Sequence, residues 1–287
     1  MTRSAQPPRN ACCPDCRCLL IERKNTDSPE SPANAETAPE LCCPNCERLF
    51  QEKCGVWDLW PATEDGFDAD DRWWQETFDR LSSERSHEDP TASDYPDRKS
   101  FDYRQLALNR WLNGQQNQLI IDVGCGPGLF TAPLCPTNEV IGLDGSGEMA
   151  LAAAKNGLIA VRAPAYRIPF ADATFSGALL IEVLQIVSDP DQVLDEVLRV
   201  IRPGGWVILS THNRHSLLRQ FLTRFFPDRG PAHRLFSYKE LARHLTRRGC
   251  ETISGRQLYL PLSFHRPISA RLPSCLATTI AVHGVKR

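Results

Sequence analysis

The stretch Leu119–Phe130 reads LIIDVGCGPGLF and decides the fold of the region around it. An apolar run of strand length ends at the acidic residue Asp122 and continues into three glycines, Gly124, Gly126 and Gly128. Glycine tolerates positive φ and lets a ligand approach the bare backbone. Doubly wound sheets bind their ligands at such turns, at the carboxyl ends of strands. The stretch therefore predicts a strand followed by a ligand-binding turn, with a purely structural turn as the alternative.

A second acidic residue follows the next predicted strand. The run Val140–Leu143 leads directly into Asp144. A carboxylate at this position, about twenty residues beyond the glycine turn, accepts hydrogen bonds from ribose hydroxyls. The dinucleotide fingerprint, however, spaces its glycines as G-x-G-x-x-G, whereas this chain has G-x-G-x-G with Cys125 between the first two. The spacing therefore disfavours a dinucleotide.

Outward from this stretch, apolar runs of strand length alternate with helical patterns from Phe101 onward. The helix expected at Pro190–Val200, for example, has an N-cap at Asp189 and apolar residues at helical spacing. Strands separated by helices predict a parallel sheet with helices on both faces. The expected helices are Arg104–Leu112, Met149–Asn156, Pro190–Val200 and Tyr238–Arg248. The expected strands are Leu119–Val123, Glu139–Leu143, Trp206–Ser210, Arg256–Leu260 and Ala277–Gly284, together with a strand that runs into a loop over Ala178–Val187.

With Asp122 ahead of the glycines, the first motif resembles the D/E-x-G-x-G-x-G signature of class I methyltransferases, which use S-adenosylmethionine. Three later stretches resemble further motifs of this family in the same order: Ala165–Phe175, Leu180–Val187 and Leu198–Leu209. The resemblance covers roughly residues 101–287. It implies a Rossmann-like α/β fold with a mostly parallel seven-stranded sheet.

The same resemblance implies the cofactor contacts. Asp122 would lie near the methionyl amino end, the three glycines with Cys125 would pass beneath the cofactor, and Asp144 would hold the ribose. Many family members also carry an aspartate that reads the adenine amino group, but here the two corresponding positions are Ala163 and Pro164. We therefore expect adenine to rest on backbone and apolar contacts, with Met149 and Ile168 as candidates.

The N-terminal cysteines predict a metal site. Cys13-x-x-Cys16 returns as Cys43-x-x-Cys46, and four thiolates at this spacing suit tetrahedral Zn²⁺. The arrangement resembles a zinc ribbon, and a ribbon ahead of a methyltransferase domain resembles the large-subunit ribosomal RNA guanine-N1 methyltransferases. Buried or redox-active thiols are the alternative, as is a register that uses one of the spare cysteines Cys12, Cys18, Cys42 or Cys54.

Composition divides the chain into three parts. Residues 1–60 form the cysteine-rich module, with a flexible loop expected at Asn25–Glu40. Residues 61–99 form an acidic linker with a short helix at Asp71–Leu81, and residues 100–287 form the methyltransferase domain.

Charge is unevenly distributed along the chain. Residues 58–102 carry 14 acidic and 5 basic side chains, whereas residues 211–287 carry 3 acidic and 14 basic ones. The basic end indicates either an anionic partner or charge neutralisation across the fold. The chain lacks an export signal and an apolar run long enough for a membrane span, so we expect a cytoplasmic protein.

Three hypotheses for the function remain open. The first is a small-molecule or lipid-like methyl acceptor, because an apolar helical face formed by Leu217, Leu218, Phe221, Leu222 and Phe225 resembles the acceptor lid of quinone-type methyltransferases; a core helix is the alternative. The second is RNA, which the ribbon and the basic C-terminal segment favour. The third is a partner-binding protein with a residual methyltransferase fold. The candidate general bases are Glu182, His212 and His215, and the oligomeric state stays open.

Overall fold

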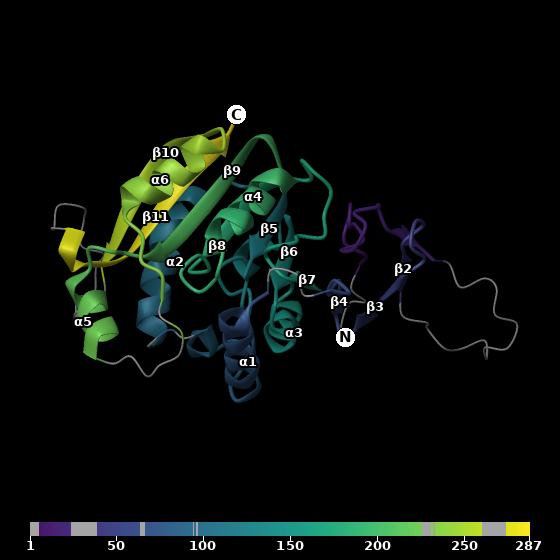
Figure 1. Ribbon diagram of the computed structural model, residues 1–287, viewed down its shortest axis with the longest axis horizontal. Helices are drawn as coiled ribbons and strands as arrows, with labels where there is room; N and C mark the ends of the chain where they lie inside the picture. The colour runs from purple at the N-terminus through teal and green to yellow at the C-terminus, as the bar shows by residue number, and fades with distance from the viewer. Residues whose placement is uncertain are drawn as a thin grey trace, which may run out of the picture.

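The computed structural model describes residues 6–23, 39–63, 67–93, 95, 97–225, 231, 233–259 and 274–287. Within these ranges, eleven strands form one sheet in the order β1-β2-β3-β4-β7-β6-β5-β8-β9-β11-β10 (Figure 1). No helix in the same ranges has both the length and the apolar character that a bilayer span requires.

Seven strands make the central part of this sheet. The neighbours from β7 to β9 pair in parallel, and β11 and β10 complete the edge with antiparallel pairing. The all-buried pattern of β8 is typical of a parallel strand covered on both faces. The predicted Rossmann-like, mostly parallel sheet is therefore confirmed. The seven strands are β5 (Leu119–Val123), β6 (Glu139–Asp144), β7 (Ile159–Arg162), β8 (Phe175–Ile181), β9 (Ile201–His212), β10 (Cys250–Tyr259) and β11 (Ala277–Lys286).

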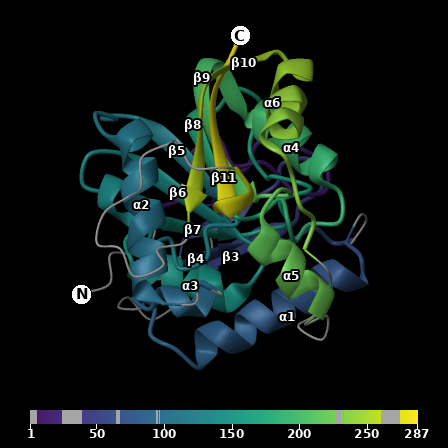
Figure 2. The same cartoon turned by 90° about the vertical axis from the view of Figure 1, so that its left-hand side faces the viewer.

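Helices lie on both sides of this sheet. Figure 2 shows α2 on one side and α4 with α6 on the other, while α1 and α5 lie below the lower end of the sheet. Local signals explain where they begin: Asp68 and Ser237 form capping boxes at α1 and α6, and Asp189 caps α4. The α-helices are α1 (Ala69–Ser83), α2 (Arg98–Leu112), α3 (Gly147–Lys155), α4 (Pro190–Val200), α5 (Leu217–Phe225) and α6 (Tyr238–Arg247), and short 3₁₀ turns cover Pro90–Ser93, Ala132–Leu134 and Ser274–Leu276.

The N-terminal cysteine module continues the same sheet. Its strands β1 (Ile21–Glu22), β2 (Glu40–Cys42), β3 (Leu49–Lys53) and β4 (Val56–Asp58) pair antiparallel in sequence. The last of them, β4, then pairs in parallel with β7. Trp57, at the centre of β4, is fully buried in the main hydrophobic core. The module is therefore attached to the domain through the sheet and the core.

Several elements are longer than the sequence pattern predicts. α2 begins at Arg98 rather than at Arg104, because Asp97 accepts a hydrogen bond from the backbone N–H of Ser100 and caps the helix there. β10 begins at Cys250 and pairs with β11 along its length, whereas the predicted strand starts at Arg256 and ends at Leu260, which lies outside the described residues. The loop predicted at residues 25–40 lies outside the described residues except for its last two.

Candidate cofactor and acceptor site

The glycine turn after β5 leaves no room for side chains. Gly124 and Gly126 have φ values of 67° and 54°, the left-handed region that favours glycine. A Cβ at Gly124 would lie 2.4 Å from Val183 Cγ2, and a Cβ at Gly126 would lie 2.9 Å from Ser93 Oγ. The turn therefore exposes bare backbone to the cavity, as the sequence predicts. Gly128 also has positive φ but does not line the cavity.

Asp122 lies at the base of the cavity and is almost completely buried. Its Oδ2 accepts a hydrogen bond of 2.8 Å from the hydroxyl of Thr131. Burial raises the pKa of this carboxyl group to about 7, since the single hydrogen bond only partly offsets the cost of desolvating the charge. A cation beside Asp122 would favour the carboxylate form.

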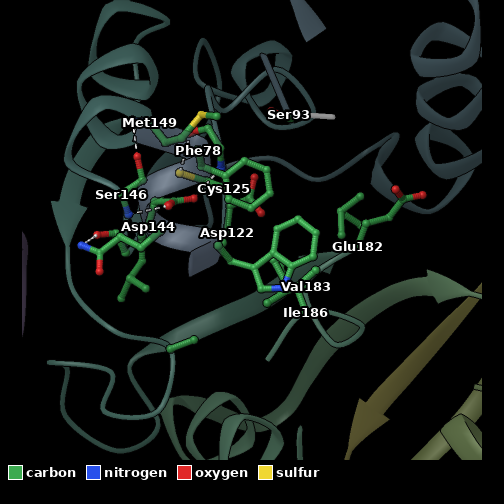
Figure 3. Close-up of a pocket in the computed structure, with 18 of the residues that line it drawn as sticks. Phe78, Ser93, Asp122, Cys125, Asp144, Ser146, Met149, Glu182, Val183 and Ile186 are labelled. Carbon is green, nitrogen blue, oxygen red and sulfur yellow. Dashed lines mark hydrogen bonds between the residues drawn. The ribbon is translucent and has the colours of Figure 1, made fainter. Parts of the chain in front are cut away.

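Asp144 follows β6 and closes the opposite side of the glycine turn. It accepts hydrogen bonds from the backbone N–H groups of Gly126 at 2.8 Å and of Ser146 at 2.9 Å. Burial nevertheless raises its pKa to about 6. Figure 3 shows Asp122, Asp144, Cys125 and Met149 around one cavity.

Helix α1 forms the roof of this cavity, a role that the sequence pattern did not reveal. Gln75 Nε2 donates to the carbonyl of Gly145 at 3.0 Å. The carboxylate of Asp79 accepts from Ser146 Oγ at 2.5 Å and from the N–H of Glu148 at 3.2 Å, at the start of α3. The aromatic residues Trp73, Trp74 and Phe78 in the acidic linker are the only hint in the sequence, and two of them line the cavity. The predicted short helix is thus a wall of the site.

The far end of the cavity is occupied by Glu182, directly after β8. Its φ of 59° is unusual for a residue with a side chain, and such strain is typical of functional sites. Glu182 Oε1 lies 2.9 Å from Arg104 Nε, in a buried ion pair, and accepts a hydrogen bond of 3.3 Å from Thr279 Oγ1. The sequence pattern did not single out Arg104, because its partner lies about eighty residues away on another element.

The other candidate residues lie outside the cavity lining. His212 is buried behind Glu182, with its Nε2 3.9 Å from Glu182 Oε2, and burial lowers its pKa well below the usual range, so the imidazole is neutral. His215 is exposed to solvent at the surface. Ile168 is fully buried in the hydrophobic core, because its side chain packs among apolar residues instead of facing the cavity. The structure therefore brings Glu182 to the cavity but not these three residues.

The described cavity residues match the chemistry of S-adenosylmethionine. Its positive charges suit the two buried carboxyl groups, Asp122 and Asp144, and its ribose suits a carboxylate at the end of β6. The hydroxyl of Ser93 is buried at the lining beside Gly126 and has no hydrogen-bond partner, as expected of a group that awaits a ligand. Of the two positions where the family aspartate is missing, Pro164 lines the cavity and Ala163 does not.

The four predicted metal-ligating cysteines form one cluster. The Sγ atoms of Cys13, Cys16, Cys43 and Cys46 all lie within 4.8 Å of one another. The two pairs have matching local geometry, since the residues after them, Arg17 and Glu47, both adopt positive φ. The cluster is compatible with a tetrahedral zinc site. The spare cysteines of the module lie outside it.

The fold and this cavity define a Rossmann-like domain with an acidic cavity beside its glycine turn. A family model described as "Methyltransferase domain" matches residues 121–209. These residues therefore form a methyltransferase domain, and this family implies S-adenosylmethionine as the methyl donor.

Individual relatives are distant. An uncharacterized protein of Methanocaldococcus jannaschii is 30% identical over 143 residues, which cover 48% of this chain and 66% of the relative. A ubiquinone biosynthesis O-methyltransferase of Paraburkholderia phymatum is 30% identical over 37% of this chain and 50% of the relative. The chain thus spans between half and two thirds of these curated relatives. Among solved structures, a possible histamine N-methyltransferase from Thermotoga maritima has a TM-score of 0.58 at 23% identity, over 74% of this chain and 99% of that chain. At this identity the similarity shows a shared fold only.

Proposed function

We propose that this protein transfers a methyl group from S-adenosylmethionine to a small-molecule acceptor. The observation that carries this proposal is the charge of the cavity. Asp71, Asp122, Asp144 and Glu182 line it, whereas no lysine, arginine or histidine does so among the described residues. A cationic cofactor suits this environment, and a polyanionic acceptor does not. The name of the Paraburkholderia relative, an O-methyltransferase of ubiquinone biosynthesis, also supports a small acceptor.

The basic C-terminal segment offers little support for RNA. Arg214 pairs with Glu240, Arg248 pairs with Asp191 and Asp195, and Arg287 pairs with Glu251. The Nζ of Lys286 donates to the carbonyls of residues 198 and 201. These four ion pairs and two hydrogen bonds to carbonyls reduce the charge that a phosphate backbone would meet. The acidic partners lie on α4, on α6 and at the start of β10, not in the acidic linker.

The reaction requires little more than alignment in a cavity with restricted water. When bound, S-adenosylmethionine supplies a methyl group on a positively charged sulfur. Asp122 would hold the methionyl ammonium, Asp144 the ribose hydroxyls, and the backbone of Gly124 and Gly126 would pass beneath. Met149 and Pro164 would contact the adenine ring. Each of these assignments is based on the position of the residue in the lining of the cavity.

We assign the general base to Glu182. Its carboxylate would accept the proton of the attacking group while the acceptor atom forms a bond to the methyl carbon. The bond between that carbon and sulfur breaks, and its electron pair stays on sulfur. Arg104 and Thr279 would position the carboxylate for this step.

The decisive experiment is a calorimetric titration of the full chain with S-adenosylmethionine and S-adenosylhomocysteine. We expect binding by the wild type and a loss of about tenfold or more in the Asp144→Asn variant, because a ribose-binding carboxylate contributes charge-assisted hydrogen bonds. Asp172→Asn, at an exposed carboxylate whose side chain is 78% accessible, is the matched control and should bind like the wild type. A folded protein that binds neither compound would overturn the proposal and favour a partner-binding protein with a residual fold.

A further inference from the structure

Two groups of aromatic rings form the walls of the cavity beyond the glycine turn. On the roof, Trp74 and Phe78 are stacked with centroids 5.7 Å apart. In a second part of the lining, Phe101 and Phe130 lie 4.6 Å apart, and Tyr95 contacts both. All five line the cavity, and Trp74 and the three rings of the second group are buried. Rings that are fixed by one another in this way form a rigid apolar surface for a flat ligand.

The charged side chain that lines this part of the cavity is acidic. Glu182 lies at its end, as Figure 3 shows, beside Val183 and Ile186. The guanidinium of Arg104 is paired with Glu182 and also donates from Nη1 to the carbonyl of Ser100 at 3.0 Å. It is therefore held in a buried network and is not offered to an anionic ligand. A carboxylate or phosphate on the acceptor would lose its hydration without gaining a cationic side chain among the described lining residues.

We infer that the methyl acceptor is an uncharged aromatic compound with a hydroxyl group, bound between the two groups of rings with its hydroxyl donating to Glu182. This inference rests on the proposed function and narrows it. The rings select a planar apolar body, the carboxylate selects a hydrogen-bond donor, and the absence of a basic group in the described lining excludes acidic analogues.

The test uses the full chain saturated with S-adenosylhomocysteine and four probes of one size in separate titrations. The probes are 2-naphthol, 2-naphthylamine, 2-naphthoate and the saturated decahydro-2-naphthol. We expect 2-naphthol to bind about tenfold or more tightly than 2-naphthoate, since the anion loses hydration beside Glu182. We also expect it to bind about tenfold more tightly than decahydro-2-naphthol, which lacks an aromatic face.

Two variants locate the site. Trp74→Leu and Phe130→Leu should each weaken the binding of 2-naphthol by about fivefold to tenfold, because each removes a ring from one wall. Trp73→Leu is the matched control, because this neighbouring indole is exposed and does not line the cavity. Binding of S-adenosylhomocysteine by each variant reports whether the cavity is folded, and using one variant from each wall means that failure of one to fold does not remove the test.

The outcomes separate this inference from the proposed function. If the protein fails to bind S-adenosylhomocysteine, the proposed function fails. If it binds this compound but binds 2-naphthoate or decahydro-2-naphthol as tightly as 2-naphthol, the inference is wrong and the proposed function stands. Tighter binding of 2-naphthylamine than of 2-naphthol would overturn the hydroxyl assignment and indicate an aromatic amine.

Discussion

Asp122 has a carboxyl group whose charge changes near neutral pH. Its carboxyl group is buried, it accepts one hydrogen bond from Thr131, and its pKa is raised to about 7. An unfolded aspartate has a pKa of about 3.9, so the folded chain holds a proton that the unfolded chain releases. The stability that this group contributes is fully present below about pH 4 and is lost as the pH rises through about 7.

We therefore predict that Asp122→Asn flattens the pH dependence of stability in the cofactor-free protein. The amide oxygen of asparagine can still accept from Thr131, but it carries no proton that titrates in this range. Between about pH 5 and pH 8, the wild type should lose about 3 kcal/mol of unfolding free energy through this residue, and the variant should not. Denaturant melts across this pH range measure the difference. Equal pH profiles in the two proteins would contradict the prediction.

The sequence predicts part of the candidate site. The spacing of strands, glycines and an acidic residue indicates the glycine turn and Asp144, and the resemblance to class I methyltransferases adds Asp122. The sequence could not show whether Ile168 lies in the core or in the cavity, because an apolar side chain after a strand suits both positions equally well. The raised pKa values could not be predicted either, since they come from burial by segments distant in the sequence.

At the scale of elements, α1 belongs to the linker and forms hydrogen bonds with residues beside the cofactor cavity. The sequence predicts a short helix there, at Asp71–Leu81. It cannot predict what the helix covers, because the partners Gly145, Ser146 and Glu148 lie about seventy residues later. The carboxylate of Asp79 is favourably placed at the N-terminus of α3, where the helix dipole stabilises a negative charge.

We predict that Asp79→Ala weakens the attachment of α1 to the start of α3. The change removes two hydrogen bonds to a charged acceptor, each of which contributes about 1.5 kcal/mol or more, so S-adenosylhomocysteine should bind about tenfold more weakly. Amide hydrogen exchange in α1 should become faster by a similar factor. Glu76→Ala, at an exposed position on the same helix, is the control and should change neither quantity. Unchanged exchange in the Asp79 variant would show that the helix is held by its apolar contacts alone.

At the scale of the whole molecule, the cysteine module packs against the segment that borders the cavity. The N–H of Cys12 donates to the carbonyl of Pro169 at 2.9 Å, and Arg167 Nη2 donates to the carbonyl of Asp15 at 2.7 Å. The same segment places Pro164 and Tyr166 at the cavity wall. The sequence predicted the four cysteine ligands from their spacing, but not this attachment, because the pairing of β4 with β7 joins segments about a hundred residues apart.

We predict that zinc in the four-cysteine cluster supports cofactor binding at a distance. The purified chain should contain one zinc ion, measured by elemental analysis. Cys43→Ser should lose this ion, lower the Tm by about 10 °C, and weaken the binding of S-adenosylhomocysteine by about tenfold, because a structural zinc site contributes folding free energy directly. Cys54→Ser, at an exposed cysteine outside the cluster, should retain the metal, the Tm and the affinity. Two measurements distinguish the possible roles of the module, since a lower Tm with unchanged affinity would mean that the module only stabilises the fold. A fall in both would mean that cofactor binding depends on the metal site through the hydrogen bonds of Cys12 and Asp15, which flank ligand residues, to residues 167–169.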